Sequence, residues 1–260
     1  MDFKFKGISA DSLNIKVINI KRSLMPTVKD IYESIPGKHG SVLFSQPFGD
    51  RLIQFDCAIP NYTPKNIKEI ADFLYSNNYE KLEIYDEEDC FYMAKLLNEG
   101  DIAEKVLTGY FTLEFVAQPF KYSHKIHAYE WKTAENKRIN ILNNGSFNTP
   151  IKLRIKTMTS TLAGIDLPAL ALGTAGIKGE IMGVKVMIND DIVKYNGIIS
   201  EDDEVIIDTK DFIVTKNGLN DIKNWDGDFP LLRSGENILE YASDNEEDAQ
   251  IEVIYRERWI

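Results

Sequence analysis

Apolar and polar residues alternate along much of this chain with the two-residue period of β-strands. The alternating stretches are rich in Ile, Val, Phe and Tyr, the side chains that fit best on a pleated sheet. Strands are therefore predicted over residues 13–20, 42–44, 53–59, 109–117, 151–155, 177–188, 204–208, 212–215 and 249–255. This pattern predicts a mainly β protein.

One segment repeats its apolar residues at helical spacing instead. Thr63 can cap a helix there, and Pro64 suits the first turn, where an N–H would lack a partner anyway. The apolar face of this helix is predicted to consist of Ile67, Ile70, Ala71 and Leu74. A helix with one apolar face packs against a neighbouring sheet, so the N-terminal part is expected to be β-rich with one packed helix.

Turn signals separate the predicted strands. Pro36 and Gly37 favour a turn, because Pro fixes φ and Gly tolerates a positive φ. A hairpin with an acidic tip is predicted over residues 81–96. Pro119 is expected to end the strand that precedes it, because proline cannot donate a hydrogen bond to a sheet ladder.

The chain is expected to form two domains. Residues 132–137 are polar and have no apolar period, so the boundary is placed there, between domains at residues 1–133 and 134–260. The second domain contains short strands separated by turns at residues 143–145 and 217–218, a spacing typical of a β-sandwich.

The formal net charge of −11 over 260 residues narrows the functional classes. Nucleic-acid binding relies on Lys and Arg neutralising phosphates, so no specific binding of DNA or RNA is expected. An anionic membrane surface is disfavoured for the same reason. No run approaches the ~20 apolar residues that cross a bilayer, and the first residues lack an apolar signal segment. Synthesis and assembly in a host cytoplasm are therefore expected.

The two cysteines, Cys57 and Cys90, are too few for a disulfide framework. Cys57 shares one strand face with Ile53, Phe55 and Ile59. This pattern predicts a buried, reduced thiol rather than a catalytic one.

Three polar clusters could carry chemistry, and none has the required pattern. The acidic tip at residues 86–89 lacks the ligand spacing of a Ca²⁺ loop, so a solvated tip or a contact between subunits is favoured. His124 and His127 supply two of the three or four protein ligands that zinc takes. Acid pairs at residues 202–203 and 226–228 are common on any acidic surface.

The usual catalytic motifs do not occur. The sequence contains no nucleophile elbow, no phosphate-binding glycine loop and no dinucleotide fingerprint. No catalytic residue, cofactor or metal is therefore expected.

Several turn-plus-strand segments occur together in one order along nearly the whole chain. They are residues 5–8, 35–41, the helix at Pro64, residues 85–94, 115–120, 143–145 with Pro150, and 227–237. In this joint order they resemble the distal tail protein family of siphophages. The resemblance singles out as signature or structural residues Pro36, Gly37, Gly40, Asp86, Glu87, Tyr92, Pro119, Pro150, Gly227, Phe229, Pro230, Gly235 and Asn237.

The resemblance implies a structural hub at the tip of a phage or prophage tail. The N-terminal domain would form a homohexameric ring, single or stacked, and the C-terminal domain a galectin-like or carbohydrate-module-like β-sandwich. In the family the ring joins the tail tube protein to the tail-associated lysin or fibre, and DNA passes through its lumen. Receptor-binding proteins are further implied partners, and the implied location is the virion.

Two other functions stay open at this point. The C-terminal sandwich could be a carbohydrate-binding module for cell-wall polysaccharide, with Trp225 as the candidate contact for a sugar or a partner. Trp131, Trp225 and Trp259, with the many Tyr and Phe residues, could stack on sugars or anchor an interface, but most of these aromatic side chains are expected in the core, since burial of an aromatic ring removes much apolar surface from water. A wall hydrolase is the third function, and the missing catalytic motifs disfavour it.

Overall fold

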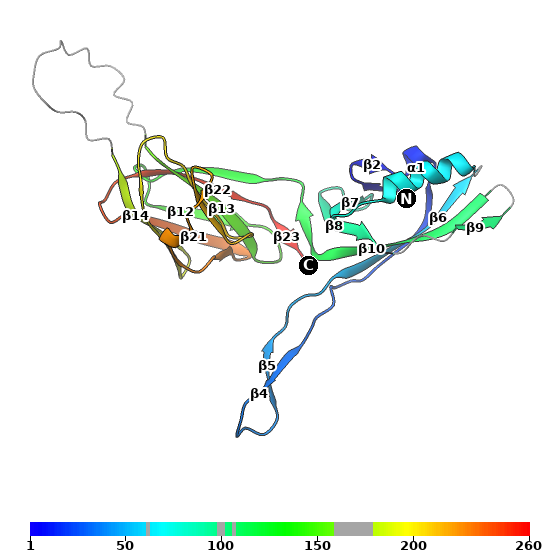
Figure 1. The fold of residues 1–260 in the computed structure, drawn as a ribbon, viewed down its shortest axis with the longest axis horizontal. Helices are drawn as coiled ribbons and strands as arrows, with labels where there is room; N and C mark the ends of the chain where they lie inside the picture. The colour runs from blue at the N-terminus through cyan, green and yellow to red at the C-terminus, as the bar shows by residue number, and fades with distance from the viewer. Residues whose placement is uncertain (61–62, 98–101, 106–107, 159–178) are drawn as a thin grey trace, which may run out of the picture. The chain divides into compact units, whose positions relative to one another are not determined.

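The computed structural model describes residues 1–60, 63–97, 102–105, 108–158 and 179–260. The chain divides into two compact units, which are Met1–His124 with Arg258–Ile260 (unit 1) and Lys125–Glu257 (unit 2) (Figure 1). The described residues are mainly in strands, with one α-helix. The predicted fold class, mainly β with a single helix in the N-terminal part, is confirmed.

Unit 1 is built on one antiparallel sheet and one hairpin. Its strands are β1 (Phe3–Phe5), β2 (Ile8–Ser9), β3 (Lys16–Arg22), β6 (Arg51–Pro60), β7 (Glu80–Ile84), β8 (Cys90–Leu96), β9 (Ile102–Lys105), β10 (Thr108–Ser123) and β23 (Arg258–Trp259), with a 3₁₀ turn, η1 (Asp11–Leu13). The sheet order is β2-β1-β7-β8-β10-β6-β3, and β9 and β23 also pair with β10. Within the described ranges, the strands β4 (Ile31–Ser34) and β5 (Ser41–Ser45) pair only with each other.

Aromatic rings fill the core of unit 1. Alternate residues of β6 are buried, among them Phe55 and Cys57, as the sequence pattern predicts. The Phe55 ring lies 4.4 Å from that of Phe3 and 5.8 Å from that of Phe115, so three strands meet at one aromatic cluster. Each such ring contributes roughly 1.5–3 kcal/mol by leaving water.

The helix α1 (Pro64–Leu74) covers this cluster. Thr63 Oγ1 accepts a hydrogen bond from the Asn66 N–H at 3.4 Å, which gives the predicted cap. Ile70, Phe73 and Leu74 are buried. Ala71 is exposed, so its predicted place on the apolar face is wrong, because the i, i+3, i+4 face runs through Phe73 instead.

Two strand boundaries differ from the prediction. The first predicted strand begins with η1 and becomes β3 only at Lys16. The strand β10 does not end before Pro119 but continues to Ser123. Its register against β8 shifts between Ala117 and Lys121, so the proline lies in an irregular segment where no regular ladder bond is needed from it.

Unit 2 consists of two antiparallel sheets. One sheet has the order β11 (His127–Lys132), β22 (Ala249–Tyr255), β13 (Thr149–Thr157), β16 (Val205–Asp208), β17 (Ile213–Lys216) and β18 (Leu219–Asn220), with β20 (Leu231–Leu232) on β13. The other has the order β12 (Arg138–Asn143), β21 (Gly235–Ala242), β14 (Ile181–Ile188), β15 (Asp191–Ile199) and β19 (Trp225–Gly227). A 3₁₀ turn, η2 (Ile222–Asn224), precedes β19.

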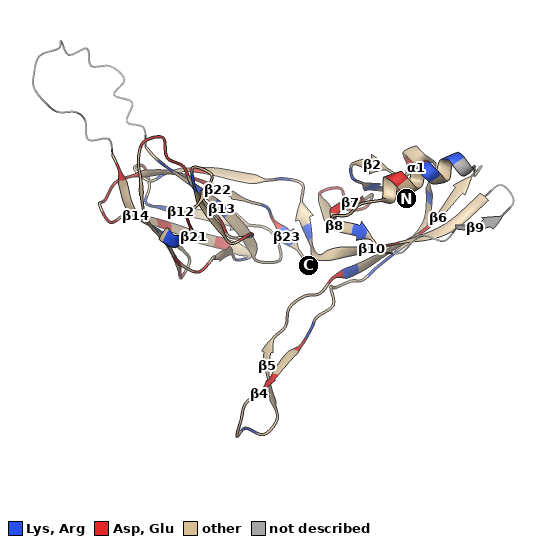
Figure 2. Ribbon diagram, in the orientation of Figure 1, with Lys and Arg blue, Asp and Glu red and all other residues tan. Residues whose placement is uncertain are grey.

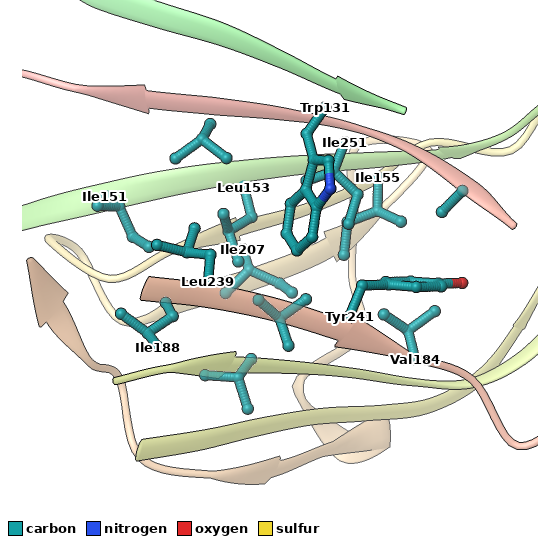
Figure 3. Packing of buried hydrophobic residues seen from close by; sticks show 14 of the residues in the cluster. Trp131, Ile151, Leu153, Ile155, Val184, Ile188, Ile207, Leu239, Tyr241 and Ile251 are labelled. Atoms are coloured by element: carbon teal, nitrogen blue, oxygen red, sulfur yellow. The ribbon is translucent and has the colours of Figure 1, made fainter. Parts of the chain in front are cut away.

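The two sheets of unit 2 enclose one apolar core (Figure 3). Trp131 is its largest side chain, 1% exposed, and its Nε1 donates to the Asn136 carbonyl at 2.6 Å. Leu153 and Ile207 come from the same sheet as Trp131, while Leu239 and Val184 face them from the other sheet. This arrangement is the predicted β-sandwich.

Residues 125–133 illustrate how the units divide. The boundary predicted from the polar stretch assigns them to the N-terminal domain, whereas β11 lies in unit 2, paired with β22 from His127↔Tyr255 to Lys132↔Gln250. The polar stretch that suggested the boundary forms the connection between β11 and β12. There Thr133 is buried and its Oγ1 lies 2.8 Å from Asp248 Oδ1.

The two thiols should differ sharply in reactivity. Cys57 is 1% exposed and burial raises its pKa to about 12, so it should resist alkylation of the native protein at mildly alkaline pH. Cys90 is partly exposed and should react first. Peptide mass spectrometry after timed alkylation measures both rates, and modification of Cys57 ahead of Cys90 would contradict the burial.

Candidate assembly surface

The hairpin between β3 and β6 presents an exposed apolar surface. We call residues 23–50 the arm. Its strands β4 and β5 pair with each other and with no further strand among the described residues (Figure 1). The arm exposes Leu24, Met25, Val28, Ile31, Tyr32, Ile35, Leu43 and Phe44, at 43–93% of their surface. A two-stranded hairpin has no core of its own, so these side chains fit a contact with another protein surface.

The arm carries little charge. It has five charged side chains among its 28 residues, at Lys29, Asp30, Glu33, Lys38 and Asp50, and most of it is tan in Figure 2. A low charge lowers the cost of removing its surface from water, because few charged groups lose their hydration.

The tip of the arm explains three signature residues. The Lys38 N–H donates to the Ile35 carbonyl at 3.0 Å, with Pro36 and Gly37 between them and Gly37 at φ +85°. This is a type II turn, which needs a positive φ at its third position and so favours Gly there. Gly40 has φ +82° and closes the loop before β5.

A network of charged side chains lies where the arm leaves the sheet. Arg22 donates to both carboxylate oxygens of Asp86, with Nη1 at 3.1 Å and Nη2 at 2.5 Å. Glu87 Oε1 lies 3.4 Å from Arg22 Nη1 and accepts from Lys121 Nζ at 2.6 Å. The hydrogen bond from Arg22 holds the pKa of Asp86 below its usual range. Two signature acids, Asp86 and Glu87, therefore have partners within the chain.

Arg51, on the other side of the arm, is a buried cation. It is 3% exposed; its Nε donates to the Pro119 carbonyl at 2.7 Å and its Nη1 to the Ser23 carbonyl at 3.4 Å. Burial lowers the pKa of the Arg51 guanidinium. Tyr92 is buried near this network, and burial raises the pKa of its hydroxyl, with the Glu87 charge adding to the shift.

The strand β3 forms one edge of the sheet in unit 1. Its only strand partner among the described residues is β6, so the backbone groups on its other side pair with no strand there. Ile18 on this strand is 52% exposed. An exposed edge strand is a template for pairing or packing with a second chain.

The signature residues of unit 2 shape turns. Asn237 is fully buried, and its side chain donates to the carbonyls of Arg233 at 2.8 Å and Gly235 at 2.9 Å. Its Oδ1 accepts from the Arg233 N–H at 2.8 Å. Gly235 has φ +92°, and Gly227 has φ +116° with the Ile192 carbonyl only 2.6 Å from where a Cβ would lie. These residues hold the backbone in its turns.

Pro150, Phe229 and Pro230 contribute to the sandwich itself. Pro150 pairs with Leu231 at the start of β13, and Pro230 is buried. Phe229 stacks on Trp225 at 5.1 Å between ring centroids, and both pack against the core. Trp225 is thus partly covered within the chain, and its contact with a sugar or partner stays a prediction.

The hollow beside β15 and η2, about 640 Å³, has a polar lining. It includes Asn196, Asn217 and Asp221, whereas Tyr195, its aromatic member, is 1% exposed. Tyr195 donates its hydroxyl to Asp221 Oδ2 at 2.6 Å. The ring is therefore covered, and the stacking platform that sugar-binding sites commonly use is not part of this hollow.

Three of the remaining candidates for chemistry, Asp203, His124 and His127, lie near oppositely charged or ionisable side chains of the chain. Asp203 pairs with Lys216 at 2.7 Å and accepts from the Ser200 N–H at 2.8 Å, and the Lys216 bond lowers its pKa to about 2. His124 lies 4.0 Å from Glu83 in unit 1, and His127 lies 3.5 Å from Glu257 in unit 2. Within the described ranges no three His, Cys, Asp or Glu side chains form a metal-binding group. The described helix is too short and polar to span a membrane.

Two family models match this chain. The model of the phage tail protein RIFT-related domain matches residues 11–117, and the model of the siphovirus-type tail component, C-terminal domain, matches residues 174–259. No curated protein matches the chain.

Several solved structures match this chain. The crystal structure of the Dit protein of phage SPP1, described as a paradigm of the hub adsorption apparatus in phages that infect Gram-positive bacteria, matches 100% of this chain and 99% of its own, at 13% identity and TM-score 0.72. Two structures of the phage P2 baseplate in its activated conformation, with Ca and with Sr, each match at 10% identity, with TM-scores of 0.49 and 0.47. They cover 98% and 97% of this chain, and in each case 97% of the matched chain. The likeness to the SPP1 protein establishes a shared fold.

Proposed function

Because this chain belongs to the distal tail protein family of siphophages, the siphovirus-type tail components, we propose that it forms the hexameric hub ring of a phage tail tip. In this role the ring joins the tail tube protein to the tail-associated lysin or fibre. The virion tail is its place of action, and assembly takes place in the host cytoplasm. The observation that carries the proposal is the apolar arm of unit 1, which has the properties of a contact between copies.

A closed ring needs two different patches on each subunit, because every copy contacts one neighbour on each side. The arm supplies the first patch. The second lies on the sheet of unit 1, where the outer edge of β3 pairs with no strand of the described part of the chain and Ile18 is exposed. We propose that the arm of one copy packs against unit 1 of the next. A ring of six closes when each copy repeats this contact.

Unit 2 is proposed to be the galectin-like domain that projects from the ring and offers a surface to receptor-binding proteins. Its support is a two-sheet sandwich with a core of its own, together with the match to the C-terminal domain model. The net charge of −11 suits a hub whose lumen passes DNA, because few phosphate contacts would form.

Photo-cross-linking from the arm tests this proposal. With p-benzoylphenylalanine at Phe44, irradiation should give a ladder of cross-linked products up to six copies, and mass spectrometry should map the new bonds to unit 1 of another copy. The same probe at Leu219, an exposed residue of unit 2 (75%), is the matched control and should give a much weaker ladder. Cross-links from Phe44 confined to its own chain would contradict the proposed contact.

A further inference from the structure

Two arginines mark the ends of the arm. Arg22 is the last residue of β3 and Arg51 is the first residue of β6, so the whole arm lies between them in the sequence. An exposed hairpin has little packing of its own to fix its direction. One aromatic contact ties this arm to the sheet, since Phe48 lies edge-on to Phe120 of β10 at 5.9 Å between ring centroids. The side-chain bonds at the two ends of the arm add to this contact in fixing how it leaves the sheet.

The Arg22 end is tied to the turn between β7 and β8. The guanidinium meets the Asp86 carboxylate with two parallel hydrogen bonds, a geometry that restrains orientation as well as distance. Glu87 extends the contact, because its Oε1 lies near Arg22 and is bonded to Lys121 of β10. Arg22 and Asp86, 64 positions apart in the sequence, thus hold the end of β3 to the β7–β8 turn, and Glu87 links this contact to β10.

The Arg51 end is tied to backbone carbonyls. A buried guanidinium needs hydrogen-bond acceptors, and Arg51 finds them for Nε at Pro119 and for Nη1 at Ser23, whereas its Nη2 has no partner among the described residues. Ser23 is the first residue of the arm, so Arg51 links the two segments at its base. Pro119 lies in the irregular part of β10, where the register against β8 shifts. The bulged strand therefore supplies an acceptor for the base of the arm.

We propose that Arg22, Asp86 and Glu87, together with Arg51, are positioning residues that fix the direction in which the arm leaves the sheet. The positioning is a property of the single chain, whereas its use, presenting the arm to the next copy, rests on the proposed ring. An arm held in one direction before it meets a neighbour loses less conformational freedom on binding. These four residues therefore speed assembly by restricting the arm before it binds.

The contact at Arg22 affects orientation more than overall stability. The side chains of Arg22 and Asp86 are 31% and 36% exposed, and partly exposed ion pairs add little to the free energy of unfolding. The ladders of β3 with β6 and of β7 with β8 hold the sheet independently of this pair. Loss of the pair should loosen the arm and leave the fold intact.

Pulsed electron–electron double resonance, which measures the distance between two spin labels, tests the proposal directly. The labels are attached at Lys38→Cys in the arm tip and at Lys4→Cys in β1. The chain also carries Cys90→Ser, which removes a reactive thiol, and Phe44→Asp, which keeps the protein monomeric, so the distance reports the direction of the arm in a single chain. When Asp86→Asn and Glu87→Gln are both added, the distribution of distances between the labels should become about twofold broader, because the two parallel hydrogen bonds that orient Arg22 are lost. The thermal unfolding midpoint should stay unchanged.

Two controls separate positioning from a general effect of charge removal. Asp11→Asn removes the partner of Lys16 at the other end of β3 and should leave the width unchanged. Exchange of the pair, with Arg22→Asp and Asp86→Arg, should restore most of the narrow distribution. An equal width in the parent chain and in the Asp86→Asn, Glu87→Gln chain would overturn the proposal.

The outcome is independent of ring formation, because the labelled chain is measured as a monomer. In chains with Phe44 restored and no labels, the Asp86→Asn, Glu87→Gln substitutions should slow hexamer formation about tenfold and leave the final mass unchanged. If the substitutions broaden the distance distribution but the natural sequence forms no hexamer, the positioning role is upheld and only the proposed ring is refuted.

Discussion

Replacing Phe44 by Asp should abolish the hexamer at micromolar concentration and leave a folded monomer. Phe44 is 69% exposed in the single chain, so its replacement removes no core contact. In the proposed hexamer the Phe44 side chain is buried against a neighbouring copy. Losing this aromatic side chain and burying a carboxylate in its place costs at least ~2 kcal/mol at each interface, so the affinity of each interface falls about thirtyfold. The same loss recurs at every interface of the closed ring.

Sedimentation velocity measures the oligomeric state of the Phe44→Asp chain, which should sediment as a monomer. The matched control is Leu219→Asp, which places the same charge on an exposed apolar residue of unit 2 and should leave the assembly intact. Circular dichroism should be identical for all three chains. A Phe44→Asp chain that sediments with the natural protein would show that the arm is not an interface.

Replacing Trp131 by Ala should lower the stability of unit 2 by about 3–5 kcal/mol. Trp131 is 1% exposed, lies edge-on to Tyr241 at 6.3 Å between ring centroids, and bonds Asn136 through its Nε1 (Figure 3). Its removal leaves a cavity between the two sheets, and the Asn136 carbonyl loses its partner. A loss of this size is a large part of the 5–15 kcal/mol that holds a domain folded.

Differential scanning calorimetry separates the transitions of the two units. The transition assigned to unit 2 should fall strongly in the Trp131→Ala chain, while that of unit 1 should stay in place because unit 1 has a core of its own. Tyr129→Ala is the control on the same strand, since Tyr129 is 45% exposed and its loss should cost less than about 1 kcal/mol. A single transition that moves as a whole would contradict two separately stable units.

The sequence predicted what is encoded in local pattern. Alternation placed Phe55 and Cys57 on one buried face, and Thr63 with Pro64 marked the start of the helix. The hairpin with an acidic tip at residues 81–96 was also visible, because two apolar strands flank a polar turn. Pro119 was misread, because the cost of a proline in a strand disappears where the register is already irregular.

The arm and its base could not be predicted in the same way. Tyr32 and Phe44 look like core residues in the sequence, since alternation tells which side chains share a face but not whether anything covers that face. The pairing of Arg22 with Asp86 joins positions 64 residues apart, and no local signal marks such a contact. Likewise β11 joins unit 2 by pairing with β22, more than a hundred residues later.

The central claim is that the chain closes into a ring of six, and its native mass tests this most directly. Light scattering after size exclusion, at two concentrations tenfold apart, should give about 178 kDa, six copies of the 29.7 kDa chain, at both. A closed ring has no free patches, so the mass should not rise further with concentration. A mass of one chain at both concentrations, or one that grows steadily without closing at six, would contradict the account.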